Sequence, residues 1–163
     1  MENQYLLYFF GPQADYYLQA AEDVQEGKIK FNPAAFLCGV LWMGYRKMYV
    51  QAFITLVIIL AESFAEDIFF PALSQNKGFG VLSPIIVNTI IGFIANRLYI
   101  NFAKRQVEAV VNHSAEKPDE AVLTLIQKKG GVAWYGPILV VFMILVMAVV
   151  LFLVADLFGI EIA

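Results

Sequence analysis

The stretch FNPAAFLCGVLWMGYRKMY, residues 31–49, decides how the chain is threaded. Asn32 is a favourable helix N-cap, and Pro33 suits the first helical position because its missing N–H needs no partner there. No charged residue follows until Arg46. The uncharged part is shorter than the roughly 20 apolar residues that a membrane span needs. We therefore expect a helix over residues 33–45 that is interfacial or re-entrant, although an apolar core helix packed on spans fits the same pattern.

The composition around this stretch is that of a membrane protein. Hydrophobic residues make up 60% of the 163 residues, and the mean hydropathy is +0.68. A soluble domain of this size would leave much of that apolar surface in water. Long apolar segments predict three transmembrane helices, over residues 47–66, 79–98 and 134–156. The predicted fold class is an all-α integral membrane protein with three transmembrane helices, the short helix described above and cytoplasmic amphipathic helices.

The positions of the basic residues orient these spans, because Lys and Arg in short loops favour the cytoplasmic side. With three spans and a cytoplasmic N-terminus, all of the 11 Lys and Arg residues except Lys77 fall on the cytoplasmic side. A fourth span over the opening stretch would separate Lys28 and Lys30 from Arg46 and Lys47. The charge pattern therefore predicts three crossings, with the N-terminus in the cytoplasm and the C-terminus outside.

The first part of the chain is more polar than the rest. Residues 1–30 are expected to form an N-terminal cytoplasmic segment with one amphipathic helix, since small and apolar residues recur on one helical face between Ala14 and Val24. The apolar residues 5–10 before this helix are compatible with a strand or with a hook resting on the membrane. Residues 31–163 then form the predicted membrane domain.

Two further helices of the membrane domain are expected in the cytoplasm, over residues 99–112 and 118–130. The second has acidic residues in its first turn and lysines in its last, which suits the helix dipole. Basic side chains near the cytoplasmic ends of the spans are expected to contact anionic headgroups, at about 1 kcal/mol each. These expected headgroup contacts are Arg46, Lys47, Arg97, Lys104 and Arg105.

Small residues and amides recur on one face of two predicted helices, a spacing that favours close helix packing. An asparagine within a span is costly against lipid, so it should form a hydrogen bond across a helix interface. Gln51 and Thr55 on the first span are the candidate partners. The residues predicted to form the helix-packing interface are Ala35, Gly39, Trp42, Asn88, Gly92 and Asn96.

Chemistry-bearing patterns are scarce. The chain has one cysteine and one histidine, which excludes an internal disulfide and a Cys/His zinc site. Glu62 and Glu66 lie one helical turn apart, but we interpret them as a solvated external helix end rather than a cation site. We expect no catalytic residues, no metal and no cofactor. With a net charge of −3, nucleic-acid binding is not expected either.

Two motifs resemble a known family. The opening stretch and the later GFIANRLYINFAKR, residues 92–105, are similar to two blocks of the small bacterial membrane proteins grouped as domain-of-unknown-function family 2628. The resemblance covers roughly residues 28–107 and implies a bacterial inner-membrane location, without transferring any catalytic residue. The matching positions are Phe31, Ala35, Phe36, Gly39, Trp42, Arg46, Lys47, Met48, Tyr49, Gly92, Asn96, Arg97 and Tyr99.

Two classes of function remain open. The favoured hypothesis is a non-enzymatic structural or accessory subunit in the lipid bilayer, which packs against itself or against other membrane protein subunits. The alternative is a small oligomeric channel or transporter with a path lined by Gln51, Thr55, Asn88 and Asn96.

Overall fold

The structure is a computed structural model that describes residues 2–114 and 118–158. All regular secondary structure in these two ranges is helical, which confirms the all-α prediction. The elements are α1 (Glu2–Phe10), η1 (Gly11–Gln13), α2 (Ala14–Gln25), α3 (Pro33–Cys38), α4 (Val40–Tyr45), α5 (Tyr49–Phe69), α6 (Pro71–Ser74), α7 (Lys77–His113), α8 (Asp119–Lys129) and α9 (Gly136–Phe158).

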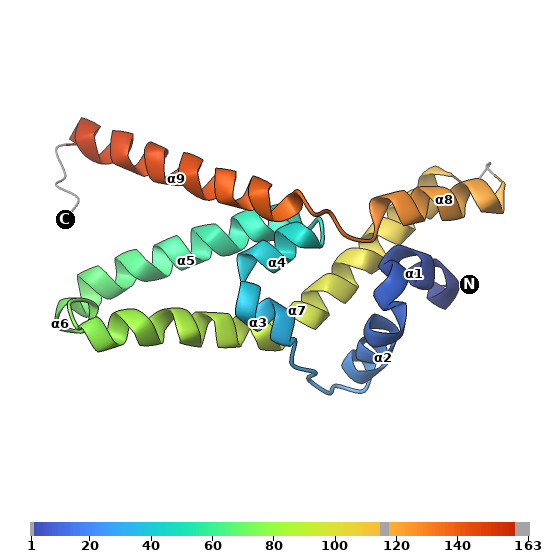
Figure 1. Cartoon of the computed structure of the whole chain (residues 1–163), viewed down its shortest axis with the longest axis horizontal. Coiled ribbons are helices and arrows are strands. Elements are labelled where there is room, and N and C mark those ends of the chain that lie inside the picture. The colour runs from blue at the N-terminus through green and yellow to red at the C-terminus, as the bar shows by residue number, and fades with distance from the viewer. Residues whose placement is uncertain (1, 115–117, 159–163) are drawn as a thin grey trace.

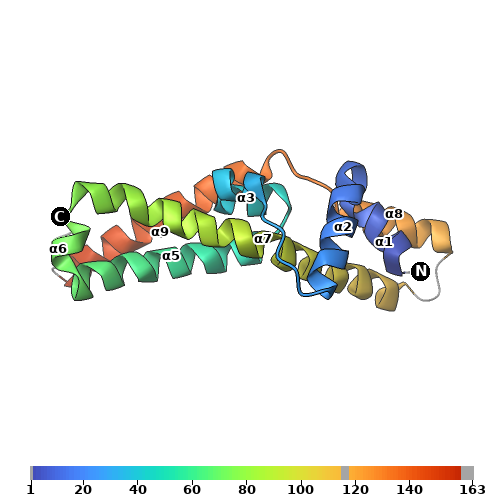
Figure 2. The ribbon, with the colours of Figure 1, turned by 90° about the horizontal axis from the view of Figure 1, so that it is seen from below.

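The helices form an elongated molecule with two halves that share α7 (Figures 1 and 2). In one half, α5 runs beside the first part of α7, α6 connects these two helices, and α9 contacts α5. In the other half, α1, α2 and α8 pack around the second part of α7. The short helices α3 and α4 lie at the junction, where α3 contacts α7, and α4 contacts α5 and α9.

Helix α7 explains this shape. It has 37 residues, so at 1.5 Å per residue it is about 55 Å long, well beyond the roughly 30 Å of a bilayer's hydrocarbon core. The Asn76 side chain caps its start by accepting a hydrogen bond from the Gly78 N–H at 2.8 Å. The predicted span over 79–98 and the predicted cytoplasmic helix over 99–112 are therefore two parts of one continuous helix.

Two helices of the described chain are long and apolar enough to cross a membrane. These are Gly78–His113 within α7 and Gly136–Leu157 within α9, whose most apolar 18-residue windows have mean hydropathies of 1.9 and 3.5. The predicted span over 47–66 coincides with α5, which has 21 residues but carries Glu62, Glu66 and Asp67 in its C-terminal half. Two of the three predicted spans thus have the length and apolar character of a membrane-crossing helix, whereas α5 does not meet this criterion.

The opening stretch forms two short helices, not the single helix predicted over 33–45. Its predicted start is confirmed, because the Asn32 side chain accepts a hydrogen bond from the Ala35 N–H at 3.0 Å. The break is at Gly39, with φ +51° and ψ −127°, a conformation that favours glycine. A Cβ on Gly39 would also lie 2.6 Å from Asn88 Oδ1. The close approach to α7 therefore also requires glycine there.

The N-terminal segment contains two α-helices, α1 and α2, where one was predicted. Residues 5–10 lie in α1, so the strand alternative is wrong. Phe9 and Phe10 are buried against the second part of α7, because their rings meet Tyr17 and Tyr99 in one aromatic cluster. The Tyr17 and Tyr99 ring centroids are 4.7 Å apart. Such pairs add about 0.5–1.5 kcal/mol beyond their buried area, so this cluster holds α1 and α2 to α7.

Glycines bring α4 and α9 into backbone contact. A Cβ on Gly136 would overlap the carbonyl group of Gly44, and a Cβ on Gly44 would lie 2.6 Å from Val140 Cγ2. The Ala133 N–H donates to the Tyr45 carbonyl oxygen at 2.9 Å just before α9 begins. The start of α9 is therefore fixed against α4, at the junction between the two halves of the molecule.

Candidate functional site

The structure brings together the residues predicted to form a helix-packing interface. Ala35 and Gly39 lie where α3 meets α7, opposite Asn88 and Gly92. A Cβ on Gly92 would lie 2.5 Å from the Phe31 ring, and the Gly92 carbonyl oxygen accepts the Asn32 N–H at 2.9 Å.

The sixth interface residue, Trp42, lies one helix further along the chain, in α4. It packs edge-on against Tyr99, with ring centroids 5.9 Å apart. Both side chains are buried. The predicted stripe therefore contacts α7 along two consecutive short helices.

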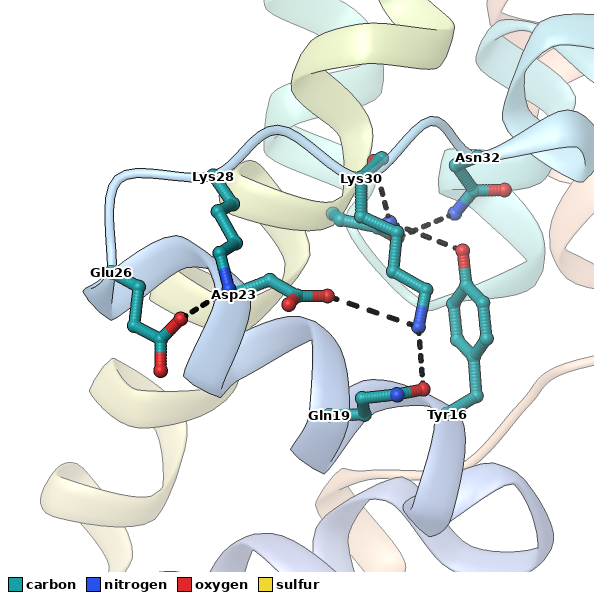
Figure 3. Close-up of polar contacts among 8 residues, drawn as sticks. Tyr16, Gln19, Asp23, Glu26, Lys28, Lys30 and Asn32 are labelled. Atoms are coloured by element: carbon teal, nitrogen blue, oxygen red, sulfur yellow. Dashed lines mark hydrogen bonds and ion pairs between the residues drawn. The ribbon is translucent and has the colours of Figure 1, made fainter.

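Asn96 is the centre of a buried amide network, and its partners Tyr16, Lys30 and Asn32 are labelled in Figure 3. Its side chain is 1% exposed, and its Oδ1 accepts a hydrogen bond from Asn32 Nδ2 at 2.8 Å. Its Nδ2 donates to the Lys30 carbonyl oxygen at 3.0 Å and to the Tyr16 hydroxyl at 3.1 Å. The network joins α7 to α2 and to the connection that leads into α3.

Gln51 and Thr55 were the predicted hydrogen-bond partners of the asparagines in the spans, but the bonds of Asn96 are to other residues. The Thr55 hydroxyl instead lies 3.6 Å from Met43 Sδ, and Gln51 Oε1 is buried without a hydrogen-bond partner. Asn32 was assigned from the sequence only as a helix cap. Its side chain serves both roles, because Oδ1 caps α3 while Nδ2 binds Asn96.

Ionic contacts hold the connection between α2 and α3 to the surface of α2 (Figure 3). Lys30 Nζ donates to Gln19 Oε1 at 2.8 Å, lies 4.0 Å from Asp23, and sits over the Tyr16 ring. Lys28 pairs with Glu26. Exposed pairs of this kind contribute about 0–1 kcal/mol each, so they orient the connection more than they stabilise the fold.

Arg46 departs most from its predicted role. An exposed headgroup contact was expected, but the side chain is only 3% exposed at the end of α4. Its Cζ lies over the rings of Tyr17 and Tyr99, 4.7 Å and 5.2 Å from their centroids. Its Nη2 donates to Gln13 Oε1, whereas Nε and Nη1 are buried and have no hydrogen-bond partner among the described residues.

No carboxylate in the described part of the chain balances the Arg46 charge, since the ion pairs there involve Lys28 and Lys30. A buried unpaired charge costs several kcal/mol, and cation–π contacts recover only about 0.5–2 kcal/mol each. The same packing affects Tyr17. Burial raises the pKa of the Tyr17 phenol, and the Arg46 charge opposes this effect.

Arg46 lies in the wall of a pocket of about 880 Å³. We call this the Arg46 pocket; it is formed by η1, the first turn of α2, α3, α4 and the start of α9. Its wall is mostly aromatic or aliphatic, and Asp15 is the acidic residue on it, exposed and not bonded to Arg46. The pocket wall includes Gln13, Ala34, Cys38, Leu41, Arg46 and Pro137.

The other four expected headgroup contacts lie in different surroundings. Lys47 adopts φ +61° and donates to the carbonyl oxygens of Lys128 and Gly130, so it caps the C-terminal end of α8. Arg97 and Arg105 are exposed on α7, and Lys104 between them is half-buried.

Glu62 and Glu66 are also placed differently from the solvated helix end that was expected. Both are half-buried, and the Ser83 hydroxyl on α7 lies 3.2 Å from Glu62 Oε1 and 3.1 Å from Glu66 Oε1. A hydroxyl has one proton to donate, so it serves one of these carboxylates at a time. The described residues contain no group of three or more His, Cys, Asp or Glu side chains that could hold a metal ion.

Comparison with protein families gives one result. A family model described as "Protein of unknown function (DUF2628)" matches residues 13–105, more than half of the chain. This match confirms the resemblance read from the two motifs. It spans η1 to most of α7, and it includes Arg46 and all six predicted interface residues. No curated protein and no solved structure matches the chain.

Proposed function

The chain belongs to the DUF2628 family, and from this membership and the fold we propose that it is a non-enzymatic, multi-pass protein of a bacterial inner membrane. It crosses the bilayer with α5, the first part of α7 and α9. Its N-terminus lies in the cytoplasm and its C-terminus outside. It acts as a structural or accessory subunit that packs against itself or against a larger membrane complex.

The observation that carries this proposal is the separation of exposed apolar surface from buried aromatic core. The most apolar 18-residue windows of α7 and α9 are only 17% and 11% buried within the chain. Large side chains such as Phe142, Leu145 and Phe152 on α9 are exposed. Lipid would cover this surface. The other half buries its aromatic residues, as a bundle in water does.

The dimensions and polar contacts of α5 support its assignment as the third span. Its 21 residues extend about 31 Å, close to the thickness of a bilayer's hydrocarbon core. Val50, Ile54 and Ile58 are exposed along it. Glu62 and Glu66 contact Ser83 on α7, so these carboxylates are directed toward protein rather than lipid.

The distribution of charge supports the proposed orientation. Lys77 lies at the α6 end of the molecule, whereas Arg46, Lys47 and Arg97 lie at or beyond the junction with α3 and α4 (Figure 1). Basic residues concentrate on the cytoplasmic side of membrane proteins. The half with α1, α2 and α8 is therefore the cytoplasmic half.

A pore lined by Gln51, Thr55, Asn88 and Asn96 has weaker support. Asn96 is 1% exposed with its amide bonded inside the monomer, and Thr55 contacts Met43. A pore would require these side chains to turn toward a shared lumen. Ion flux in liposomes that is lost on Asn88→Leu would favour the pore over the accessory role.

Extraction in a mild detergent at native expression, followed by mass measurement, tests the accessory role. We expect the 18.3 kDa chain to come out with other membrane proteins in a fixed ratio, or as a homo-oligomer of defined size. A parallel extraction in dodecyl sulfate separates non-covalent partners and provides the mass of the chain alone. A chain that comes out as a monomer in every mild detergent contradicts the accessory role.

A further inference from the structure

The Arg46 pocket combines a positive charge with a missing counter-ion. Arg46 is 97% shielded from solvent, and its Nε and Nη1 are buried without an acceptor, while Nη2 is bonded to Gln13. The arginine side chain stays charged in proteins. No described carboxylate forms an ion pair with this guanidinium, so its charge favours an anion in the adjoining pocket.

The position of the pocket relative to the proposed membrane narrows the kinds of anion that can bind in it. The pocket lies at the junction between the two halves, where Pro137 begins α9 and Leu41 lies on α4. Trp134 and Tyr135, directly before α9, are 78% and 48% exposed. Exposed aromatic residues of this kind mark the level of lipid headgroups in membrane proteins. The proposed orientation puts this level on the cytoplasmic leaflet, where anionic lipids are attracted by basic residues.

The pocket also has the shape and composition that suit an amphiphile. Its volume of about 880 Å³ exceeds what a free inorganic phosphate needs, and its wall is mainly apolar. Leu41 on the pocket wall and Ile138, which follows Pro137 in α9, are exposed apolar side chains. They link the pocket to the apolar surface of α9. A headgroup can thus enter the pocket while its acyl chains stay beside α9.

We propose that the Arg46 pocket binds the phosphate group of an anionic phospholipid, with Arg46 and Gln13 as the polar contacts. Guanidinium groups match phosphate oxygens in geometry as well as in charge. The bound phosphate then places its negative charge next to this guanidinium, which has no ion pair with a carboxylate among the described residues. This inference rests on the proposed membrane location, but its test below is done in detergent and needs no particular topology.

The position of Cys38 makes the test specific. It is the chain's one cysteine, it is exposed, and it lies in the wall of the pocket. The rate at which a water-soluble maleimide alkylates Cys38 therefore reports whether the pocket is open. The full chain, purified in a mild non-ionic detergent, is labelled in the presence of dioleoyl phosphatidylglycerol, dioleoyl phosphatidylcholine or inorganic phosphate.

Phosphatidylglycerol at ten times its dissociation constant should slow alkylation about tenfold, because the open fraction then falls to roughly one eleventh. Phosphatidylcholine, which has no net charge, should slow it much less. Both lipids contain a phosphate, but the choline cation neutralises it in phosphatidylcholine. Equal protection by both lipids overturns the proposal, because the net negative charge of the headgroup would not be recognised. Protection by inorganic phosphate equal to that by phosphatidylglycerol also overturns it, because the ligand would be a soluble phosphate.

Variants separate the pocket from general lipid adsorption. Arg46→Met should lose the protection by phosphatidylglycerol, whereas Arg97→Met, which removes an exposed arginine of α7, should keep it. Unchanged protection in Arg46→Met overturns the proposal. If Arg46→Met does not fold, Ala34→Trp is the second variant, since Ala34 is an exposed residue of the pocket wall and the added ring fills the pocket. Cys38 in Ala34→Trp should be alkylated at a rate that does not depend on lipid, and a retained phosphatidylglycerol effect overturns the proposal.

Because the assay is independent of topology, it can fail while the membrane location stands. Cysteine labelling in intact cells, described in the Discussion, tests that location separately.

Discussion

At the scale of single residues, Asn96 shows how a polar side chain is accommodated in a mainly apolar helix. Both ends of its amide are hydrogen-bonded, to Asn32, to the Lys30 carbonyl and to Tyr16. Burying an amide without such partners costs free energy, so the network offsets the cost of the polar atoms while it specifies how α2 and α7 meet. Arg46 is the contrasting residue, because its Nε and Nη1 have no hydrogen-bond partner among the described residues.

Replacing Asn96 by leucine should destabilise the protein. The substitution leaves the Asn32 amide and the Lys30 carbonyl buried without a partner, and each orphaned group costs about 1–3 kcal/mol. The free energy of unfolding, measured by dodecyl sulfate titration in mixed micelles, should therefore fall by at least about 1 kcal/mol. The matched control is Asn101→Leu on the same helix, where the side chain is exposed. Equal stability of the two variants would show that the network contributes nothing.

At the scale of elements, the contact between α4 and α9 depends on two glycines. Gly44 and Gly136 let the two backbones approach so closely that no side chain fits between them. Small residues are used in this way in membrane helix pairs, because dispersion contacts between helices replace the hydrophobic effect there. Gly39 and Gly92 act differently at the contact of α3 with α7, because they make room for the side chains of Asn88 and Phe31. The position of α9 therefore follows from the first of these contacts.

Substitution of Gly136 by alanine should force α4 and α9 apart, because the added Cβ overlaps the Gly44 carbonyl group. Overpacking of this kind costs about 1–3 kcal/mol. Gly80→Ala in α7 is the control, since nothing lies within 4 Å of its added Cβ. Alanine is a better helix former than glycine, so Gly80→Ala should be neutral or stabilising by up to about 1 kcal/mol. The same micelle titration distinguishes the two, and a Gly136→Ala variant as stable as Gly80→Ala would refute the close contact.

At the scale of the whole molecule, α7 connects a half with exposed apolar helices to a half with a buried aromatic core. Figure 2 shows this helix running through both halves. In the first half, α5 and α9 expose apolar side chains along their length. In the second half, Tyr99 and Ile126 are buried among residues of α1, α2 and α8. One helix longer than a bilayer is thick thus joins the two halves.

The proposed threading predicts opposite labelling of two engineered cysteines. In a Cys38→Ser background, Gln75→Cys near α6 should react with a membrane-impermeant thiol reagent in intact cells, because this end lies outside. His113→Cys at the end of α7 should react only after the cells are opened. Both native side chains are exposed, so access within the protein does not differ between them. The reverse pattern would refute the orientation, and equal labelling of both before lysis would refute the membrane crossing itself.

The sequence by itself determined the features that depend on local composition and spacing. The uncharged run after Gly136 predicts a long apolar helix, Asn32 predicts the start of α3, and the two motifs indicate the family. These follow because hydropathy, capping and motif spacing are properties of neighbouring residues. The small-residue stripe likewise indicated a packing face, since Gly39 and Gly92 each remove a side chain from it.

Only the tertiary structure decided which distant residues meet. The contact of Gly44 with Gly136, the bond of Asn96 to Asn32, and the burial of Arg46 between Tyr17 and Tyr99 all join segments far apart in the chain. A basic residue directly after an apolar helix indicates a position at a membrane surface. This pattern does not reveal whether the side chain turns outward or inward. Arg46 is buried because Tyr17 of α2 and Tyr99 of α7 pack against its guanidinium. This long-range packing, which no local sequence pattern encodes, buries a charge that was expected at the surface.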